Sequence, residues 1–428
     1  MYPTAVVMNM YYTGLGIARS LGERGVPVIG LTSKRGIYGN FTRYAKPVIC
    51  PDSRQEPERL LSFLLEMGKR SDHRPVIFPT RDDDLIFLDE FREQLSPYYR
   101  LTIPEREVVK ASLDKWETYQ WAQRAQVPAP KCWRIEGEKD LARIAPELTY
   151  PCVLKPVAAH HWRRGGNWEL VGGRKAICAG SWEELVSEYA SASRADKRVL
   201  VQEMIPGGDD SLWIAACYLD QDSKFVAGFN TQKLVQFPET FGTGCIVQAV
   251  DRPELFEPTV RLLQGMGFTG IAEVEYKWDQ RTGEYRLIEI NPRAWDQHRL
   301  GKACGVDLVW LCYCEHAGLP MPPTRRQVLG HKWIAEDTFL IAALCLARRP
   351  NSQLSSLFRL ARGQRIYAIW SSDDPFPFVG YGMQLMIEFA RFGPRFVWSA
   401  FRRLLRGNAS LQQKGLTYER HFGKKNAS

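Results

Sequence analysis

The chain has 428 residues, of which 45% are hydrophobic and 25% are charged, a composition typical of a globular protein with two or three domains. A wholly disordered chain is excluded, and glycine and proline are too scattered for a fibrous one. The longest apolar run is 339–347, whereas a membrane-spanning helix needs about 20 residues. We therefore expect no spanning helix, and the first residues do not resemble a signal peptide. Ten cysteines without a CxxC pair favour reduced thiols in a cytoplasmic protein.

Positive charge is concentrated near the end of the sequence. The net charge is +9, and residues 391–428 hold nine Lys/Arg and one Glu, which leaves +1 for residues 1–390. We therefore expect no nucleic-acid binding. Residues 381–406 interleave apolar side chains with arginines, and such a segment lies on an anionic membrane surface, contacts an acidic partner or packs on the protein itself. We expect core packing before Gly393 and leave the rest open, so a location at the inner face of the membrane is an alternative.

The first hundred residues predict an α/β unit, because short apolar strands alternate with segments of helical spacing. The predicted elements are a strand at 4–8, a tight turn at Gly14 and Gly16, a helix at 17–24, a strand at 26–31, a helix at 57–67, a strand at 75–79 and a helix at 82–94. Such a series predicts a doubly wound parallel sheet. The dinucleotide motif GxGxxG is incomplete. The triple acid at 82–84 is interpreted as a helix N-terminal cluster.

From Pro104 the pattern changes to a long polar helix, predicted at 105–126, which is followed by segments with strand character. The segment 160–173 is rich in glycine and basic residues and is predicted to be a mobile loop over a ligand. Beyond residue 320 the chain is helical in pattern, basic and aromatic. We therefore predict three domains, at 1–104, 105–322 and 323–428.

The most informative stretch is 269–293, where both halves alternate and predict a hairpin with a three-residue loop ending at Gly283. In this register Glu275 lies opposite Glu289, and Asn291 falls on the same face as Glu289. Two carboxylates this close repel each other unless a cation lies between them. Hard oxygen ligands suit Mg²⁺, with Mn²⁺ as an alternative metal. A solvated polar face is the alternative without a metal.

Four motifs in the correct order resemble those of the ATP-grasp superfamily. They are LIEINPR at 287–293, similar to its metal-binding strand, VLKP at 153–156, similar to its phosphate-binding lysine strand, VQEMIPG at 201–207, similar to its adenine-binding hinge, and SLDKW at 112–116, with an earlier lysine. Within the superfamily the chain most resembles carboxylate–amine ligases of the D-aspartate ligase and carbamoyl-phosphate-synthase-like type. The resemblance implies an α/β fold: a doubly wound pre-ATP-grasp domain, an ATP-grasp domain of two α+β subdomains with a hinge near 203–207, and a helical C-terminal extension.

The resemblance also implies roles for individual residues, with ATP as the cofactor. Lys115 and Lys155 would contact its phosphates, Glu203, Met204, Ile205 and Leu287 would hold the adenine, and Asp210 would bind the ribose, with Asp209 an equal candidate on spacing. Glu275, Glu289 and Asn291 would bind Mg²⁺. Arg293 would stabilise the transferring phosphoryl group. Lys233 would face phosphate or substrate, with an exposed surface position as the alternative.

The implied function is a ligase that uses ATP and Mg²⁺ to join a small-molecule carboxylate to an amine through an acyl phosphate. One alternative is an ATP-binding regulator or scaffold without turnover. Another is an ATP-dependent carboxylase, which is disfavoured because no Met-Lys-Met biotin-carrier motif is present, although a carrier on a separate chain stays open. The sequence does not identify the acid or the amine, and it leaves the oligomeric state open, with a homodimer among the alternatives.

Overall fold

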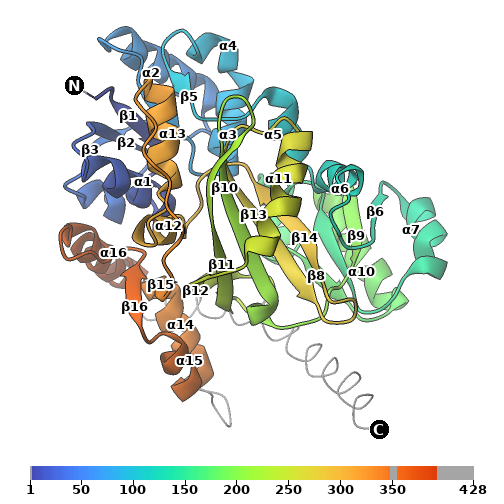
Figure 1. Cartoon of the computed structure of the whole chain (residues 1–428). Helices are drawn as coiled ribbons and strands as arrows, with labels where there is room; N and C mark the ends of the chain where they lie inside the picture. Colours follow the sequence, from blue (N-terminus) through green and yellow to red (C-terminus); the bar gives the residue numbers. More distant parts are fainter. Residues whose placement is uncertain (1, 348–353, 393–428) are drawn as a thin grey trace.

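The structure is a computed structural model that describes residues 2–347 and 354–392, and it contains three β-sheets (Figure 1). The first sheet is parallel throughout, with the order β3-β2-β1-β4-β5. Its elements are β1 (Ala5–Met8), α1 (Tyr12–Gly22), β2 (Val28–Thr32), η1 (Tyr38–Phe41), β3 (Lys46–Ile49), α2 (Pro57–Lys69), β4 (Val76–Phe78), α3 (Asp82–Glu90), α4 (Arg92–Leu95) and β5 (Arg100–Leu101). This order confirms the doubly wound parallel sheet. The chain order reverses between β1 and β4, and ligands of such sheets bind beyond the carboxyl ends of the strands at that point.

The predicted turn at Gly14 and Gly16 is wrong, because both residues lie inside helix α1. Their role is close packing. A Cβ atom on Gly14 would lie 1.9 Å from the backbone oxygen of Asn9, and one on Gly16 would lie 2.6 Å from Nε2 of His298. The glycines therefore let α1 approach the end of β1 and the segment around His298.

Two predicted helices are each divided in two. The helix predicted at 82–94 breaks at Phe91 between α3 and α4. The helix predicted at 105–126 breaks at Asp114, between α5 (Arg106–Leu113) and α6 (Lys115–Arg124). The backbone of Asp114 is extended, and its carboxylate accepts hydrogen bonds from the backbone N–H groups of Trp116 and Glu117. This cap starts a new helix, and it makes Lys115 the first residue of α6.

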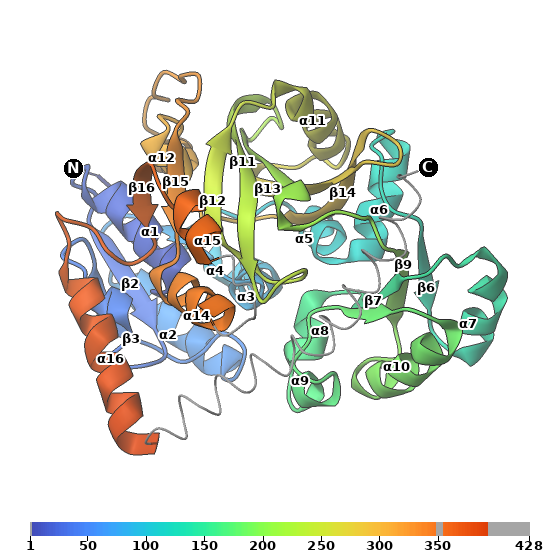
Figure 2. The ribbon, with the colours of Figure 1, turned by 90° about the horizontal axis from the view of Figure 1, so that it is seen from below.

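The second sheet is small, antiparallel and ordered β6-β9-β7-β8. Its strands are β6 (Cys132–Ile135), β7 (Cys152–Pro156), β8 (Ile177–Ala179) and β9 (Val199–Glu203), and the helices of this part are α7 (Glu138–Ile144), α8 (Ala159–Arg163), α9 (Asn167–Leu170) and α10 (Trp182–Ala195), with the short η2 (Ala145–Glu147). The segment predicted as a loop at 160–173 therefore contains most of α8 and all of α9. Figure 2 shows this small sheet on one side of the large sheet and the N-terminal sheet on the other.

The third sheet is large and has the order β14-β13-β10-β11-β12-β15-β16. Its strands are β10 (Leu212–Leu219), β11 (Phe225–Phe237), β12 (Thr243–Val250), β13 (Gly270–Asp279), β14 (Glu284–Asn291), β15 (His331–Ile334) and β16 (Gln364–Tyr367). The helices that follow β9 are η3 (Asp209–Ser211), η4 (Pro253–Leu255), α11 (Phe256–Gly265), α12 (Arg299–Ala303), α13 (Leu308–Ala317), α14 (Glu336–Ala347), α15 (Leu354–Leu360) and α16 (Phe376–Phe392). Since β15 and β16 belong to the C-terminal extension, that extension is not purely helical.

The N-terminal sheet and the large sheet share one hydrophobic core. Val7 of β1, Ile17 of α1, Phe229 of β11, Ile271 of β13 and Leu311 of α13 belong to the same buried cluster. The two sheets are therefore packed together as one body. This packing fixes the positions of the side chains that each sheet carries where the two meet. The domain boundaries at 104 and 322 stay a prediction.

A buried ion pair ties the C-terminal extension to helix α1. Nε of Arg19 lies 2.9 Å from Oδ2 of Asp374, and neither side chain is exposed. The same carboxylate accepts hydrogen bonds from the hydroxyl of Thr42 at 2.6 Å and from the backbone N–H of Arg43 at 3.0 Å. The charge of Asp374 is thus fully compensated by partners from the N-terminal unit.

None of the ten cysteines, all of which lie in the described ranges, forms a disulfide. Within residues 2–347 and 354–392, no helix combines the length and the apolarity that crossing a bilayer requires. Residues 393–428, which hold most of the basic tail, lie outside the described residues.

We expect Asp374→Ala to lower the free energy of unfolding by about 3–5 kcal/mol, because it leaves the Arg19 guanidinium buried without its partner. Urea unfolding monitored by tryptophan fluorescence measures this loss. Asp373→Ala is the matched control: that carboxylate is exposed and accepts a hydrogen bond from the Tyr44 hydroxyl, so its loss should cost less than about 1 kcal/mol. Equal losses in the free energy of unfolding for the two variants would contradict the expected contribution of the buried ion pair.

Candidate active site

A cavity of about 430 Å³ opens where the three sheets meet. It is lined by the first turn of α3, the start of α6, strand β7, the segment around α8 and α9, and strands β9 to β14. The predicted site residues that line it are Lys115, Lys155, Glu203, Met204, Ile205, Lys233, Glu275, Glu289, Asn291 and Arg293. Residues predicted on separate motifs are therefore brought to one cavity.

The register of the β13–β14 hairpin places Glu275 directly opposite Glu289, as predicted. The connection was predicted one residue too short, since Asp279 pairs with Glu284 and four residues separate them. A β-bulge at Ile288 adds one residue to β14 and restores the predicted register at the two carboxylates. Gly283 has φ +67°, a left-handed conformation that glycine adopts readily.

Each of the two carboxylates has a lysine partner from another element. Nζ of Lys233, on β11, pairs with Glu275, and Nζ of Lys115 lies 2.8 Å from Oε2 of Glu289. The positive charge of Lys115 holds the pKa of Glu289 well below its ordinary value. The side chain of Lys233 is only 9% exposed, which excludes the alternative of an exposed surface lysine. Burial opposes the charge of this lysine, but Glu275 and Glu273 raise its pKa.

Lys155, on β7, is buried in the same cavity. Burial, and then the neighbouring charge of Lys115, lower its pKa to about 8. Within residues 2–347 and 354–392, the Lys155 ammonium group forms no hydrogen bond or ion pair with another side chain, although its backbone pairs with Leu200 of β9. A buried ammonium group in this state gains from an anion that enters the cavity.

Glu273 is a third carboxylate of this face that the sequence prediction missed. It lies opposite Asn291 in the hairpin, is 5% exposed and accepts a hydrogen bond of 2.9 Å from the Asn291 side-chain amide. Burial raises its pKa to about 8. The signal was present in the sequence, because Glu273 precedes Glu275 by two residues and period two places both on one face.

Arg293 reaches across to the N-terminal unit. Its Nε and Nη2 atoms lie 2.9 and 2.6 Å from Oδ1 of Asp82, the first residue of α3. Burial opposes both charges, but their attraction raises the pKa of Arg293 and lowers that of Asp82. The acidic cluster at 82–84 was interpreted as a helix N-terminal feature, although it follows the carboxyl end of a strand, where ligands of α/β proteins bind. The structure shows that its first member also contacts a predicted catalytic residue.

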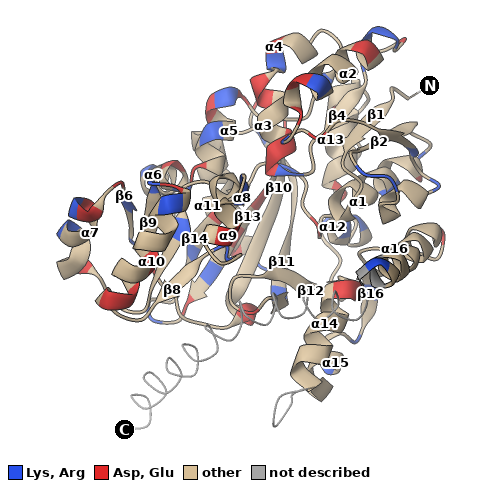
Figure 3. Cartoon of the chain, turned by 180° about the vertical axis from the view of Figure 1, so that it is seen from behind, with Lys and Arg blue, Asp and Glu red and all other residues tan. Residues whose placement is uncertain are grey.

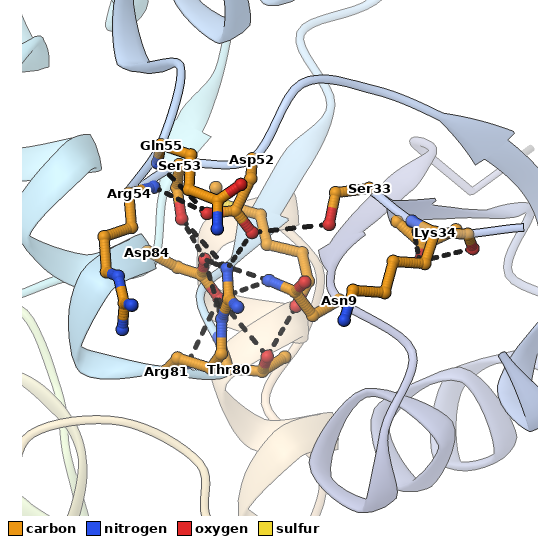
Figure 4. A network of polar contacts seen from close by, with 12 residues as sticks. Asn9, Ser33, Lys34, Asp52, Ser53, Arg54, Gln55, Thr80, Arg81 and Asp84 are labelled. Carbon is orange, nitrogen blue, oxygen red and sulfur yellow. Dashed lines mark hydrogen bonds and ion pairs between the residues drawn. The ribbon is translucent and has the colours of Figure 1, made fainter. Parts of the chain in front are cut away.

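The third member of that cluster, Asp84, anchors the first turn of α3 (Figure 4). Its carboxylate is fully buried and accepts hydrogen bonds from Asn9 at 2.9 Å, Ser53 at 2.7 Å and Arg81 at 3.0 Å. Arg81 also pairs with Asp52 at 3.2 Å. This network joins the carboxyl ends of β1 and β4 to the segment after β3, and it fixes the turn that carries Asp82.

Glu203, Met204 and Ile205 line the cavity at the end of β9, where the hinge was predicted. The Glu203 carboxylate has two partners within the protein: it accepts hydrogen bonds from Arg281 at 2.6 Å and from the backbone N–H of Lys131 at 3.2 Å. The role of this segment as the adenine contact stays a prediction.

Leu287 and Asp210 do not line the cavity. Leu287 is fully buried in the core beside β13, because the bulge turns Ile288 toward the cavity in its place. Asp210 is exposed, and Asp209 accepts hydrogen bonds from the backbone and side chain of Gln236. The ribose contact of Asp210 or Asp209 stays a prediction.

The donor set for a metal is two carboxylates and one amide oxygen. Within residues 2–347 and 354–392, no three His, Cys, Asp or Glu side chains form a ready-made metal cage. Asn291 directs its amide nitrogen to Glu273, which leaves its oxygen for a ligand role beside Glu275 and Glu289. Few protein oxygens of this kind fit Mg²⁺, which keeps positions for water and phosphate oxygens.

The segment between β7 and β8 covers part of the cavity. His160, Trp162, Arg163 and Trp168, on α8 and α9, belong to its lining. Gly165, Gly172 and Gly173 have positive φ angles, and no protein atom lies within 4 Å of where a Cβ on Gly165 would be. Gly165 lies between the two short helices, and Gly172 and Gly173 follow the second one, which is the construction expected of a lid.

Residues 231–317, which contain Lys233 and the complete β13–β14 hairpin, match the family model "Carbamoyl-phosphate synthase L chain, ATP binding domain". The chain is 22% identical to D-aspartate ligase of Enterococcus faecium over 299 residues, 67% of this chain and 69% of that protein. It is 25% identical to D-alanine–D-alanine ligase of Pseudomonas entomophila over 193 residues, 42% of this chain and 54% of that protein.

A solved structure gives the fold. The biotin carboxylase domain dimer of 2-oxoglutarate carboxylase from Hydrogenobacter thermophilus, in complex with MgADP, ADP and bicarbonate, superposes with a TM-score of 0.63 at 19% identity. The match covers 78% of this chain and 73% of that one. The chain has the ATP-grasp fold. The resemblance to the ATP-grasp superfamily and the predicted fold class are thereby confirmed.

We expect Glu273→Gln to change how the stability of the protein depends on pH. The folded pKa of Glu273 is raised to about 8 from an ordinary value of 4.5, so between these values the folded state keeps a proton that the unfolded state has lost. The contribution of Glu273 is fully present below the unfolded pKa and is lost as the pH rises through the folded pKa. Glutamine has no such titration, so the variant should gain stability relative to the native protein between about pH 5 and about pH 8.

Urea midpoints of both proteins at the two pH values measure this difference. Glu284→Gln is the control, because Glu284 is exposed at the start of β14 and pairs with Arg286 at 3.2 Å. That variant should follow the native curve. If the stability of Glu273→Gln and that of the native protein changed equally between the two pH values, folding would not raise the pKa of Glu273.

Proposed function

We propose that the protein is an ATP-dependent ligase that joins a small-molecule carboxylate to an amine through an acyl phosphate. The observation that carries the proposal is the convergence of Glu275, Glu289 and Asn291 with Lys155 and Arg293 in one cavity. Both sequence relatives compared above are named ligases of amino acids, which supports a carboxylate and an amine as the substrates.

Each residue would have a defined part in the reaction. The hinge 203–205 would hold the adenine, and Lys155 and Lys115 would bind the phosphates of ATP. Mg²⁺, or Mn²⁺ in its place, would be held by Glu275, Glu289 and Asn291 and would neutralise charge on the phosphate oxygens. Lys115 and Lys233, which pair with the two carboxylates, would turn toward phosphate oxygens when that cation is bound.

The chemistry would proceed in two displacements. A carboxylate oxygen of the substrate attacks the terminal phosphorus of ATP, the bond from phosphorus to the bridging oxygen breaks, and ADP leaves. The amine then attacks the acyl carbon, phosphate leaves with the electron pair, and the amine loses a proton. Arg293, fixed by Asp82, would stabilise the charge on the transferring phosphoryl group and on the acyl phosphate.

The two alternatives are less well supported. A regulator without turnover has no need for the two opposed carboxylates, their lysine partners and Arg293 in one cavity. An ATP-dependent carboxylase is suggested by the solved neighbour, but a likeness at 19% identity concerns the fold alone, whereas the sequence relatives are named ligases.

The direct test is ADP release from the purified protein with Mg²⁺ and ATP, on addition of pools of carboxylates and amines. We expect ADP in equal amount to a new amide, which mass spectrometry identifies, and only with pools that contain both substrates. Absence of ADP with every pool, together with intact nucleotide binding, would support the regulator. ADP formed with bicarbonate and without an amine would support the carboxylase.

We expect Glu289→Gln to lower turnover by about three orders of magnitude, or about 4 kcal/mol in the barrier, because the amide cannot supply the negative charge that the cation requires. ATP binding should weaken only modestly. Steady-state ADP release and a nucleotide-binding titration measure the two effects. Glu284→Gln makes the same change at the exposed end of β14 and should leave both unchanged. Native turnover in Glu289→Gln would remove this residue from the site.

We expect the lid residues 159–173 to become protected from hydrogen exchange when a non-hydrolysable ATP analogue and Mg²⁺ are added. Closure over the phosphates would exclude water from the acyl phosphate. Mass spectrometry of peptides from this segment measures the change, with peptides of α7 as the control because none of its residues lines the cavity. Unchanged exchange in both segments would mean that the segment is not a lid.

A further inference from the structure

Helix α16 exposes a continuous apolar surface. The exposed fractions of its large apolar side chains lie between 42% and 66%, and these residues are Phe376, Phe378, Val379, Met383, Leu385, Met386 and Ile387. Phe376, Val379, Met383 and Met386 recur at intervals of three and four residues, so they form one stripe along the helix. We call these seven residues the α16 apolar face. An exposed patch of this extent marks an interaction surface rather than scattered surface hydrophobes.

The opposite side of the same helix is held against the body of the protein. A Cβ atom on Gly380 would lie 2.4 Å from the ring of Phe41, so the helix approaches η1 closely at this glycine. The rings of Tyr381 and Tyr38 are 5.7 Å apart, edge to face. The segment just before the helix is fixed by the buried pair of Asp374 and Arg19. The structure therefore presents the α16 apolar face outward in a defined orientation.

The charges around this face indicate its partner. In Figure 3, α16 is tan along almost its whole length, since Glu388 and Arg391 are the only charged residues of 376–392. The sequence that follows, 393–428, holds eight Lys/Arg and one Glu. An apolar surface directly followed by a strongly basic segment matches an anionic lipid surface, which offers an apolar interior and negative headgroups together.

Two other occupants fit less well. A second copy of this chain on the same face would bring two strongly basic segments together, and their repulsion opposes such a dimer. The chain's own residues 393–428 would gain no charge pairing by covering the face, because they hold eight Lys/Arg and α16 supplies a single acidic residue. Neither occupant satisfies the apolar face and the basic segment at once.

We propose that the α16 apolar face, with the basic residues that follow it, docks the protein on an anionic lipid surface. The apolar side chains would insert among the acyl chains, and the lysines and arginines would bind the headgroups. The proposal does not rest on the ligase activity, because its residues lie outside the cavity.

Sedimentation of the full-length protein with vesicles tests the proposal. We expect binding to vesicles of phosphatidylcholine with phosphatidylglycerol, less binding to phosphatidylcholine alone, and a loss of binding as the salt concentration rises. The double variant Met383→Glu/Met386→Glu should bind at least about tenfold more weakly, because it places two charges in the inserted stripe. Val328→Glu/Leu329→Glu is the matched control: it adds the same charge at side chains that are 56% and 47% exposed outside α16, and it should bind as the native protein does.

Several results would overturn the proposal. The first is absence of the native protein from the vesicle pellet, and the second is equal binding by the α16 variant and the control. A native dimer without vesicles that the α16 variant converts to a monomer would assign the face to a second copy. A native protein that does not bind vesicles, with an α16 variant that melts at a lower temperature than the control, would assign the face to packing within the chain.

Discussion

Two carboxylates that face each other across a hairpin repel each other unless positive charge compensates them, and the site depends on this constraint. Glu275 and Glu289 each have a lysine, and the two lysines come from different parts of the fold, Lys233 from β11 and Lys115 from the start of α6. The constraint therefore acts on tertiary structure: the large sheet and α6 must meet at this point for the charges to balance. A divalent cation would satisfy the same requirement, and the two lysines would then be free to bind anionic oxygens, as proposed above.

The N-terminal unit is part of the site for a similar reason. Arg293 is nearly buried and needs an anionic partner, which it finds in Asp82 on α3. The first turn of α3 is fixed in turn by Asp84, whose carboxylate is fully buried and surrounded by donors from Asn9, Ser53 and Arg81. A series of ion pairs and hydrogen bonds thus connects the parallel sheet to Arg293, which follows the hairpin. These contacts explain why the first turn of α3, which follows β4 of the N-terminal sheet, lines the cavity.

The sequence predicted the parts of the site that depend on local periodicity, and it failed where tertiary contacts decide. The pairing of Glu275 with Glu289 follows from alternation along two strands, and it survived an error in the loop because a bulge at Ile288 compensated for it. That bulge also moved Leu287 into the core, which alternation alone could not foresee. The break at Asp114 depends on a capping carboxylate, a local signal that was present but was outweighed by helical spacing on both sides. The turn at Gly14 failed because the glycines serve packing against Asn9 and His298, and the distant partner is invisible in the sequence.

The C-terminal extension is a second example of a prediction that tertiary contacts decide. Core packing was expected before Gly393, and helix α16 does pack through Gly380 and Tyr381, yet its other side is exposed. An apolar pattern around most of a helix predicts burial without specifying what buries it. In α16 one side is buried by η1, and the described residues supply no cover for the stripe from Phe376 to Met386. Since exposed apolar area is costly in water at about 25 cal/mol per Å², an apolar cover from outside this set of residues would stabilise the stripe. The adjoining positive charge of the sequence is the reason for proposing an anionic lipid surface as that cover.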